Sequence, residues 1–146
     1  HTDYECFTIL LATANGLEVQ NGAGEWIDAP MVDGAFVINI GDMMEVLSNG
    51  HYVATMHHVR KVKQERYSFP MFCACDYDTV IEPVPALITR DNPSRYEPVI
   101  CGEHLYAQTM QTFSYLKKRL SEGIISLPKG AKGLSSFGHQ AKQPIV

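Results

Sequence analysis

The feature of this sequence that most constrains its fold is a close succession of short strand-forming segments separated by turn residues. Asn-Gly pairs at 15–16 and 21–22 interrupt runs rich in apolar and aromatic residues. Such a pair between two strand-like runs is the strongest short-range signal for a β-hairpin. Strands are predicted at 4–12, 17–20, 25–29, 35–40, 51–59, 66–75 and 80–84. Short strands at this spacing are typical of β-sandwiches and barrels.

Beyond residue 98 the pattern changes from strand-like to helical. Between Gly102 and Leu120, side chains of one face recur at steps of three and four residues, which predicts a single amphipathic helix. The expected buried face consists of Leu105, Thr109, Thr112, Phe113, Leu116 and Leu120. Because most of the predicted β-structure precedes one late helix, we expect a mainly β fold: a double-stranded β-helix, or jelly roll, with this helix packed outside it.

The length of 146 residues is that of one domain. We expect a core with its outer helix over 1–120 and a tail over 121–146, where glycine, serine and lysine offer little apolar surface to bury. No apolar run approaches the ~20 residues that cross a bilayer, which argues against a membrane protein. The net charge of −4 argues against a nucleic-acid-binding surface.

The four cysteines, at positions 6, 73, 75 and 101, include no Cys-x-x-Cys pair. The sequence also shows no Asn-x-Ser/Thr glycosylation site and no signal-peptide pattern. These features predict a cytoplasmic protein with free thiols.

An imidazole and a carboxylate stand two residues apart at His1 and Asp3. On a strand, side chains at i and i+2 share a face, so both can converge on one point. Two histidines and one carboxylate on one face of a metal, with open positions opposite, form the facial triad of non-haem Fe(II) oxygenases. Strand alternation does not choose between His57 and His58 as the second histidine. The full set of candidates is His51, His57, His58, His104 and His139.

Further motifs follow in order along the chain. They are Gly-Glu-Trp-Ile-Asp-Ala-Pro at 24–30, Gly-Ala-Phe-Val-Ile-Asn-Ile-Gly-Asp at 34–42, Ser-Asn-Gly at 48–50, His57, Arg-Tyr-Ser at 66–68, Tyr-Glu-Pro at 96–98 and Gly-Glu at 102–103. Together with His1-Thr-Asp3, they resemble the C-terminal catalytic half of an Fe(II)- and 2-oxoglutarate-dependent dioxygenase of the isopenicillin N synthase-like family. Subunits of that family also have a helical N-terminal half, so we expect this chain to be an excerpt that lacks it.

The resemblance implies a role for each of five motif residues. His1, Asp3 and His57 match the iron ligands of the family. Arg66 and Ser68 match its Arg-x-Ser motif, which holds the far carboxylate of 2-oxoglutarate. The chemistry agrees, because a guanidinium fork and a hydroxyl on one strand face can grip one carboxylate.

The resemblance also implies an activity. The enzyme would couple decarboxylation of 2-oxoglutarate and the use of O2 to hydroxylation, desaturation or cyclisation of a small organic molecule, with Fe(II) as cofactor. These residues specify neither that substrate nor an oligomeric state. Alternation along its strand places Phe72 on the same face as Ser68, which makes it a candidate for the substrate pocket. Packing in the core explains this aromatic equally well.

Three other interpretations account for parts of the pattern. The first is an iron oxidase that uses no 2-oxoglutarate, as isopenicillin N synthase does, with the Arg-x-Ser pair holding a carboxylate of the substrate. The second is a copper monooxygenase that chelates its metal through an N-terminal histidine, which leaves Asp3, Arg66 and Ser68 unexplained. The third is a non-catalytic jelly-roll binding module, which the presence of all the triad residues disfavours.

Overall fold

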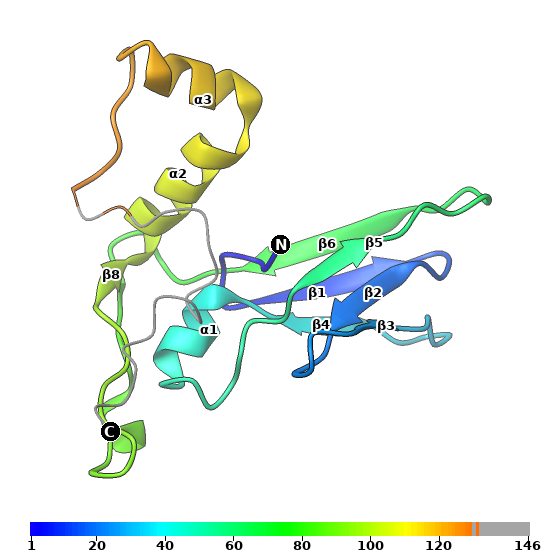
Figure 1. Ribbon diagram of the computed structural model, residues 1–146, viewed down its shortest axis with the longest axis horizontal. Helices are drawn as coiled ribbons and strands as arrows, with labels where there is room; N and C mark the ends of the chain where they lie inside the picture. The colour runs from blue at the N-terminus through cyan, green and yellow to red at the C-terminus, as the bar shows by residue number, and fades with distance from the viewer. Residues whose placement is uncertain (130, 132–146) are drawn as a thin grey trace.

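A computed structural model describes residues 1–129 and 131, and most of its strands form two facing three-stranded sheets (Figure 1). The sheets have the orders β4-β1-β6 and β3-β2-β5, and every pairing in them is antiparallel. The strands are β1 (Phe7–Ala12), β2 (Leu17–Gln20), β3 (Trp26–Asp28), β4 (Val37–Ile40), β5 (His57–Val59), β6 (Ser68–Cys73), β7 (Val80–Ile81) and β8 (Val99–Ile100). The helices are α1 (Asp42–Leu47), α2 (Cys101–Thr112) and α3 (Ser114–Ser121). This architecture confirms the mainly β jelly roll expected from the sequence.

The register of the first sheet decides which side chains face the second. Thr8 of β1 stands opposite Asn39 of β4 and opposite Phe72 of β6. Because side chains alternate along a strand, these three share one face. They border a cavity whose other wall includes Leu17 and Val19 of β2. The space between the sheets is therefore a lined cavity, and the candidate site lies in it.

The tightly buried apolar core lies beside α1, at one end of the sheets. Met43 and Val46 of α1 are both fully buried there. The cluster consists of Cys6, Met43, Val46, Ile81, Tyr96 and Cys101. The same helix is tied to the start of the chain, because the N–H groups of Asp42 and Met43 donate to the carbonyls of Asp3 (2.9 Å) and Glu5 (3.1 Å). These bonds satisfy backbone donors that a helix start otherwise leaves without partners.

Gly41, directly before α1, allows this close approach and gives a first testable prediction. A Cβ at position 41 would overlap the backbone carbonyl of Glu5, which cannot move without shifting the segment that carries Asp3. We expect Gly41→Ala to lower the free energy of unfolding by about 1–3 kcal/mol, the cost of overpacking a well-fitted site. Urea denaturation measures this change.

Gly22→Ala is the matched control, since an added Cβ there meets no atom within 4 Å. It should change stability by only a few tenths of a kcal/mol, roughly the scatter of surface substitutions. Equal stabilities of the two variants would show that the contact at Gly41 relaxes without cost.

The strand expected over 51–59 was wrong for most of its length, because β5 covers only His57–Val59. Two features divert the preceding backbone from a sheet ladder. Asn49 adopts a left-handed conformation with φ 51°, which turns the chain after α1. The N–H of Ala54 then donates to the carboxyl group of Glu45 (2.7 Å) and not to a neighbouring strand.

The single helix expected over Gly102–Leu120 is two helices, α2 and α3. The backbone at Phe113 is extended (φ −79°, ψ 127°) and separates them. The Thr112 hydroxyl donates to the carbonyl of Gln108 (2.8 Å), and threonine, phenylalanine and serine are all weaker helix formers than alanine or leucine. Three such residues in a row therefore mark the break.

The expected buried face of the helix was also wrong. Leu105 and Thr109 are only half-buried. Within α2 the buried residues are Cys101, Gly102, His104, Ala107, Gln108 and Met110. A Cβ at Gly102 would overlap the ring of Tyr77, so the first turn of α2 lies in close contact with this ring. Most of the predicted tail, 121–146, lies outside the described residues, and no helix of the described part is long and apolar enough to cross a membrane.

Candidate metal centre and co-substrate pocket

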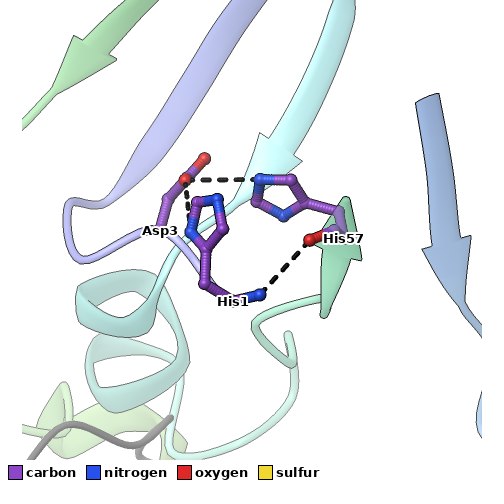
Figure 2. Close-up of side chains that lie close together, drawn as sticks. All are labelled: His1, Asp3 and His57. Atoms are coloured by element: carbon purple, nitrogen blue, oxygen red, sulfur yellow. Dashed lines mark hydrogen bonds and ion pairs between the residues drawn. The ribbon is translucent and has the colours of Figure 1, made fainter. Parts of the chain in front are cut away.

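His1, Asp3 and His57 converge on one point, with both imidazole rings turned toward the carboxylate (Figure 2). His57 Nε2 lies 3.5 Å from Asp3 Oδ1, and His1 Nδ1 lies 3.7 Å from the same oxygen. His57 opens β5, whereas the other two precede β1. A backbone bond from His57 N–H to the carbonyl of His1 (2.9 Å) holds the two segments side by side.

The three side chains have the spacing of a metal site. One ligand atom from each lies within 4.8 Å of the others. Two ligand atoms about 2.1 Å from a metal and at right angles to each other are about 3 Å apart, so contraction by a few tenths of an ångström brings His57 and Asp3 to bonding distance. Two histidines and one carboxylate form the donor set that suits Fe(II) with open positions for further ligands.

The remaining candidate histidines lie elsewhere. His58 Nε2 contacts Glu18 Oε2 at 2.6 Å, and its ring stacks on Trp26 with centroids 4.0 Å apart. His51 is exposed and His104 is buried on α2. His139 is outside the described residues. The geometry therefore identifies His57, and not His58, as the second histidine of the site. Side-chain alternation along the strand did not distinguish the two.

Asp3 is buried and has two hydrogen-bond donors that the sequence analysis did not single out. The Thr8 hydroxyl donates to Asp3 Oδ2 at 2.6 Å, and the Asn39 amide donates to the same oxygen at 2.7 Å. Asn39 meets Asp3 only through the pairing of β4 with β1, which a single sequence does not mark. Thr8 lies five residues from Asp3 in the same segment, but a lone threonine there carries no signal of this role. The Ile-Asn-Ile-Gly-Asp stretch contained Asn39 as part of the motif, without a role.

Other carboxyl groups near Asp3 bind protons more readily than usual. Burial raises the pKa of Asp42 to about 7, and nearby negative charges, including that of Asp3, act in the same direction. Burial also raises the pKa of Glu5. Both groups are therefore protonated over a wider pH range than an ordinary carboxyl group.

A buried carboxyl group fixes the loop that delivers His57. Glu45 of α1 accepts one hydrogen bond from Ala54 N–H (2.7 Å) and another from the Tyr96 hydroxyl (2.9 Å). Burial raises the pKa of Tyr96, so this hydroxyl keeps its proton and remains a donor. The loop before β5 is thus anchored to α1 three residues ahead of the proposed ligand.

Tyr96→Phe tests this anchor. The substitution leaves a buried oxygen of Glu45 without its donor, so we expect the free energy of unfolding to fall by about 1–3 kcal/mol. Thermal or urea unfolding measures the loss. Tyr52→Phe serves as control, because the side chain of Tyr52 is exposed. Removal of its hydroxyl should leave the free energy of unfolding unchanged. A Tyr96→Phe variant as stable as the parent would show that the hydrogen bond from Tyr96 to Glu45 does not anchor the loop.

The triad lies in a cavity of about 210 Å³ between the two sheets. The cavity is also lined by Arg66, Ser68, Pro70 and Phe72, so the face predicted by alternation is the one that the structure presents to it.

Arg66 Nε donates to the carbonyl of Ala14 (3.1 Å), which fixes the plane of the guanidinium. Its Nη2 is buried and has no hydrogen-bond partner among the described residues. A buried cationic donor without a partner is costly unless an anion from outside satisfies it.

Comparison with known families gives an independent result, since residues 1–74 match the model described as the 2OG-Fe(II) oxygenase superfamily. The chain belongs to this superfamily. Its donor set and the buried, unpartnered Nη2 of Arg66 fit the two groups that the superfamily is named for, a ferrous ion and the dicarboxylate 2-oxoglutarate.

Individual members of the superfamily and their solved structures are similar to most of the chain. The chain is 40% identical to homoarginine-6-hydroxylase 2-ODD-C23 of Glycine max over 117 residues, which are 77% of this chain and 35% of that protein. It resembles the crystal structure of the dioxygenase for auxin oxidation in rice (TM-score 0.66, 31% identity, 84% of this chain and 40% of that one). It also resembles JOX2 in complex with 2OG, Fe and JA (TM-score 0.67, 26% identity, 99% and 38%). The chain thus spans well under half of the length of these oxygenases.

Proposed function

We propose that the chain forms the catalytic core of a non-haem Fe(II) oxygenase that couples decarboxylation of 2-oxoglutarate to the oxidation of a small organic molecule by O2. The observation that carries the proposal is the buried, unpartnered Arg66 Nη2 in the same cavity as the triad of His1, Asp3 and His57. An anion held by Arg66 would share this cavity with the metal. The superfamily match supports this pairing of metal and anion.

In this proposal the residues have separate tasks. His1, Asp3 and His57 hold Fe(II), which supplies the redox chemistry that activates O2 when bound. Arg66 and Ser68 hold the far carboxylate of 2-oxoglutarate and so orient its 2-oxo acid end toward the triad. Phe72, which lines the same cavity, borders the space for the substrate.

Finer features of the protein belong to the same proposal. Hydroxylation is the reaction named for the Glycine max relative, and we propose it for this chain ahead of desaturation or cyclisation. The motifs at 24–30 and 34–42 favour the isopenicillin N synthase-like branch. The four cysteines are free in the structure, which favours a cytoplasmic location. The catalytic part is taken as 1–120, with 121–146 as a tail.

The test is stoichiometric. Anaerobic protein loaded with Fe(II) is given 2-oxoglutarate and O2, and succinate, CO2 and consumed O2 are measured together. Equal amounts of succinate, CO2 and consumed O2, abolished by a chelator, are expected. Consumption of O2 that does not depend on 2-oxoglutarate would contradict the proposal and identify an oxidase.

A further inference from the structure

We propose that Thr8 and Asn39 are positioning residues that hold one oxygen of Asp3, so that the other oxygen alone binds the metal. This inference rests on the proposed function, because it concerns the same metal centre. We name the pair the Asp3 clamp. It predicts that metal affinity and coordination depend on two side chains that do not touch the metal.

The two carboxylate oxygens of Asp3 have different surroundings. Both donors of the clamp, Thr8 Oγ1 at 2.6 Å and Asn39 Nδ2 at 2.7 Å, point at Oδ2. The other oxygen, Oδ1, faces the imidazoles of His57 (3.5 Å) and His1 (3.7 Å). Two donors on one oxygen occupy the lone pairs that would otherwise compete for the cation. The carboxylate therefore presents Oδ1 as a single ligand atom.

The clamp is built on rigid elements. Thr8 and Asn39 are directly opposite each other in the pairing of β1 with β4, so their side chains reach Asp3 from neighbouring strands. Thr8 is 3% exposed, Asp3 is 6% exposed and Asn39 is half-buried, so bulk water has little access to the carboxylate. Groups held on strands position a ligand more accurately than groups on loops.

The surroundings of His57 indicate that the Asn39 amide donates its hydrogen bond to Asp3 and not to His57. Asn39 Nδ2 also lies 3.4 Å from His57 Nδ1, and that nitrogen is 3.1 Å from the carbonyl of Thr55. A histidine that binds a metal through Nε2 carries its proton on Nδ1 and donates it, here to Thr55. Two donors do not bond to each other, so the amide of Asn39 has Asp3 as its acceptor in the metal-bound state.

Variants that keep shape but remove a donor test the clamp in the full chain. Thr8→Val is isosteric and lacks the hydroxyl, whereas Thr8→Ser keeps the hydroxyl and loses a methyl group. Affinity is measured with Mn(II) and Co(II) by titration, without turnover. We expect Thr8→Val to weaken binding about 10- to 100-fold, the usual effect of losing a hydrogen bond to a metal ligand, and Thr8→Ser to restore most of the affinity.

Asn39→Leu tests the second donor and should weaken binding by a similar factor. In the double variant Thr8→Val/Asn39→Leu, Oδ2 is released and can join the metal, so the visible spectrum of bound Co(II) should change toward a higher coordination number. Thr13→Val is the control: its hydroxyl donates to a backbone carbonyl, that of Tyr67 (3.4 Å), away from Asp3. Its affinity and spectrum should equal those of the parent.

Two results would overturn the inference, and they differ from failure of the proposed function. One is parental affinity and an unchanged Co(II) spectrum in the folded Thr8→Val/Asn39→Leu variant. The other is equal loss in Thr8→Ser and Thr8→Val, which would mean that packing of the methyl group matters and the hydroxyl does not. A parent chain that binds no divalent metal would overturn the proposed centre itself, and the clamp with it.

Discussion

Asp3→Ala is expected to abolish tight binding of Fe(II), with affinity reduced at least about 100-fold, beyond the usual cost of losing a hydrogen bond to a ligand. Asp3 supplies the one carboxylate in the three-residue donor set, and its Oδ1 faces both imidazoles. Without it two neutral nitrogens remain, which are too few to fix the ion. Titration with Mn(II) or Fe(II) under anaerobic conditions measures the loss. Asp3→Asn keeps the shape of the side chain and removes the charge, so it should weaken binding as well.

His58→Ala is the matched control for the choice of ligands. The imidazole of His58 contacts Glu18 and Trp26 in the β3-β2-β5 sheet, although it is adjacent in sequence to His57. We expect His58→Ala to bind iron as the parent does, and His57→Ala to lose it. Loss of iron in His58→Ala with retention in His57→Ala would show that the second histidine ligand was assigned wrongly.

The two histidines also illustrate how much of the site is readable from the sequence. Alternation placed Arg66 and Ser68 on one strand face, and the structure presents both to the cavity. It did not decide between His57 and His58, because both faces of the strand expected over 51–59 carry mixed side chains. The prediction of His57 came from the resemblance to a family, because that resemblance depends on the spacing of motifs along the whole chain.

Features that depend on contacts between distant segments could not be predicted. Asn39 reaches Asp3 only because β4 pairs with β1 in one register, and a shift of β4 by one residue would turn its side chain away. The break at Phe113 was missed for a different reason, which is local. The periodic pattern continues through it, and the pattern does not weigh the low helix propensity of the local residues. Strand positions and Asn-Gly turns, in contrast, are local signals, and they were mostly right.

Arg66→Lys is expected to raise the concentration of 2-oxoglutarate needed for half-maximal turnover about tenfold to a hundredfold. Arginine offers donors in a fixed plane: Nε binds the carbonyl of Ala14, and the buried Nη2 remains free for a carboxylate. Lysine has a single ammonium group and cannot serve both acceptors with that geometry. Loss of one charge-assisted bond costs about 1.5–3 kcal/mol, which corresponds to this range of affinity.

The same substitution separates the two uses of the cavity. Iron affinity should be unchanged in Arg66→Lys, because Arg66 is not among the three ligands. Arg60→Lys is the matched control: Arg60 is partly exposed and pairs with Glu18 and Asp28, so its replacement should leave the 2-oxoglutarate requirement unchanged. If Arg66→Lys instead weakens binding of the oxidised substrate while 2-oxoglutarate has no effect on turnover, the guanidinium holds a carboxylate of the substrate. The unpartnered Nη2 would then still mark an anion site, but one that belongs to an oxidase.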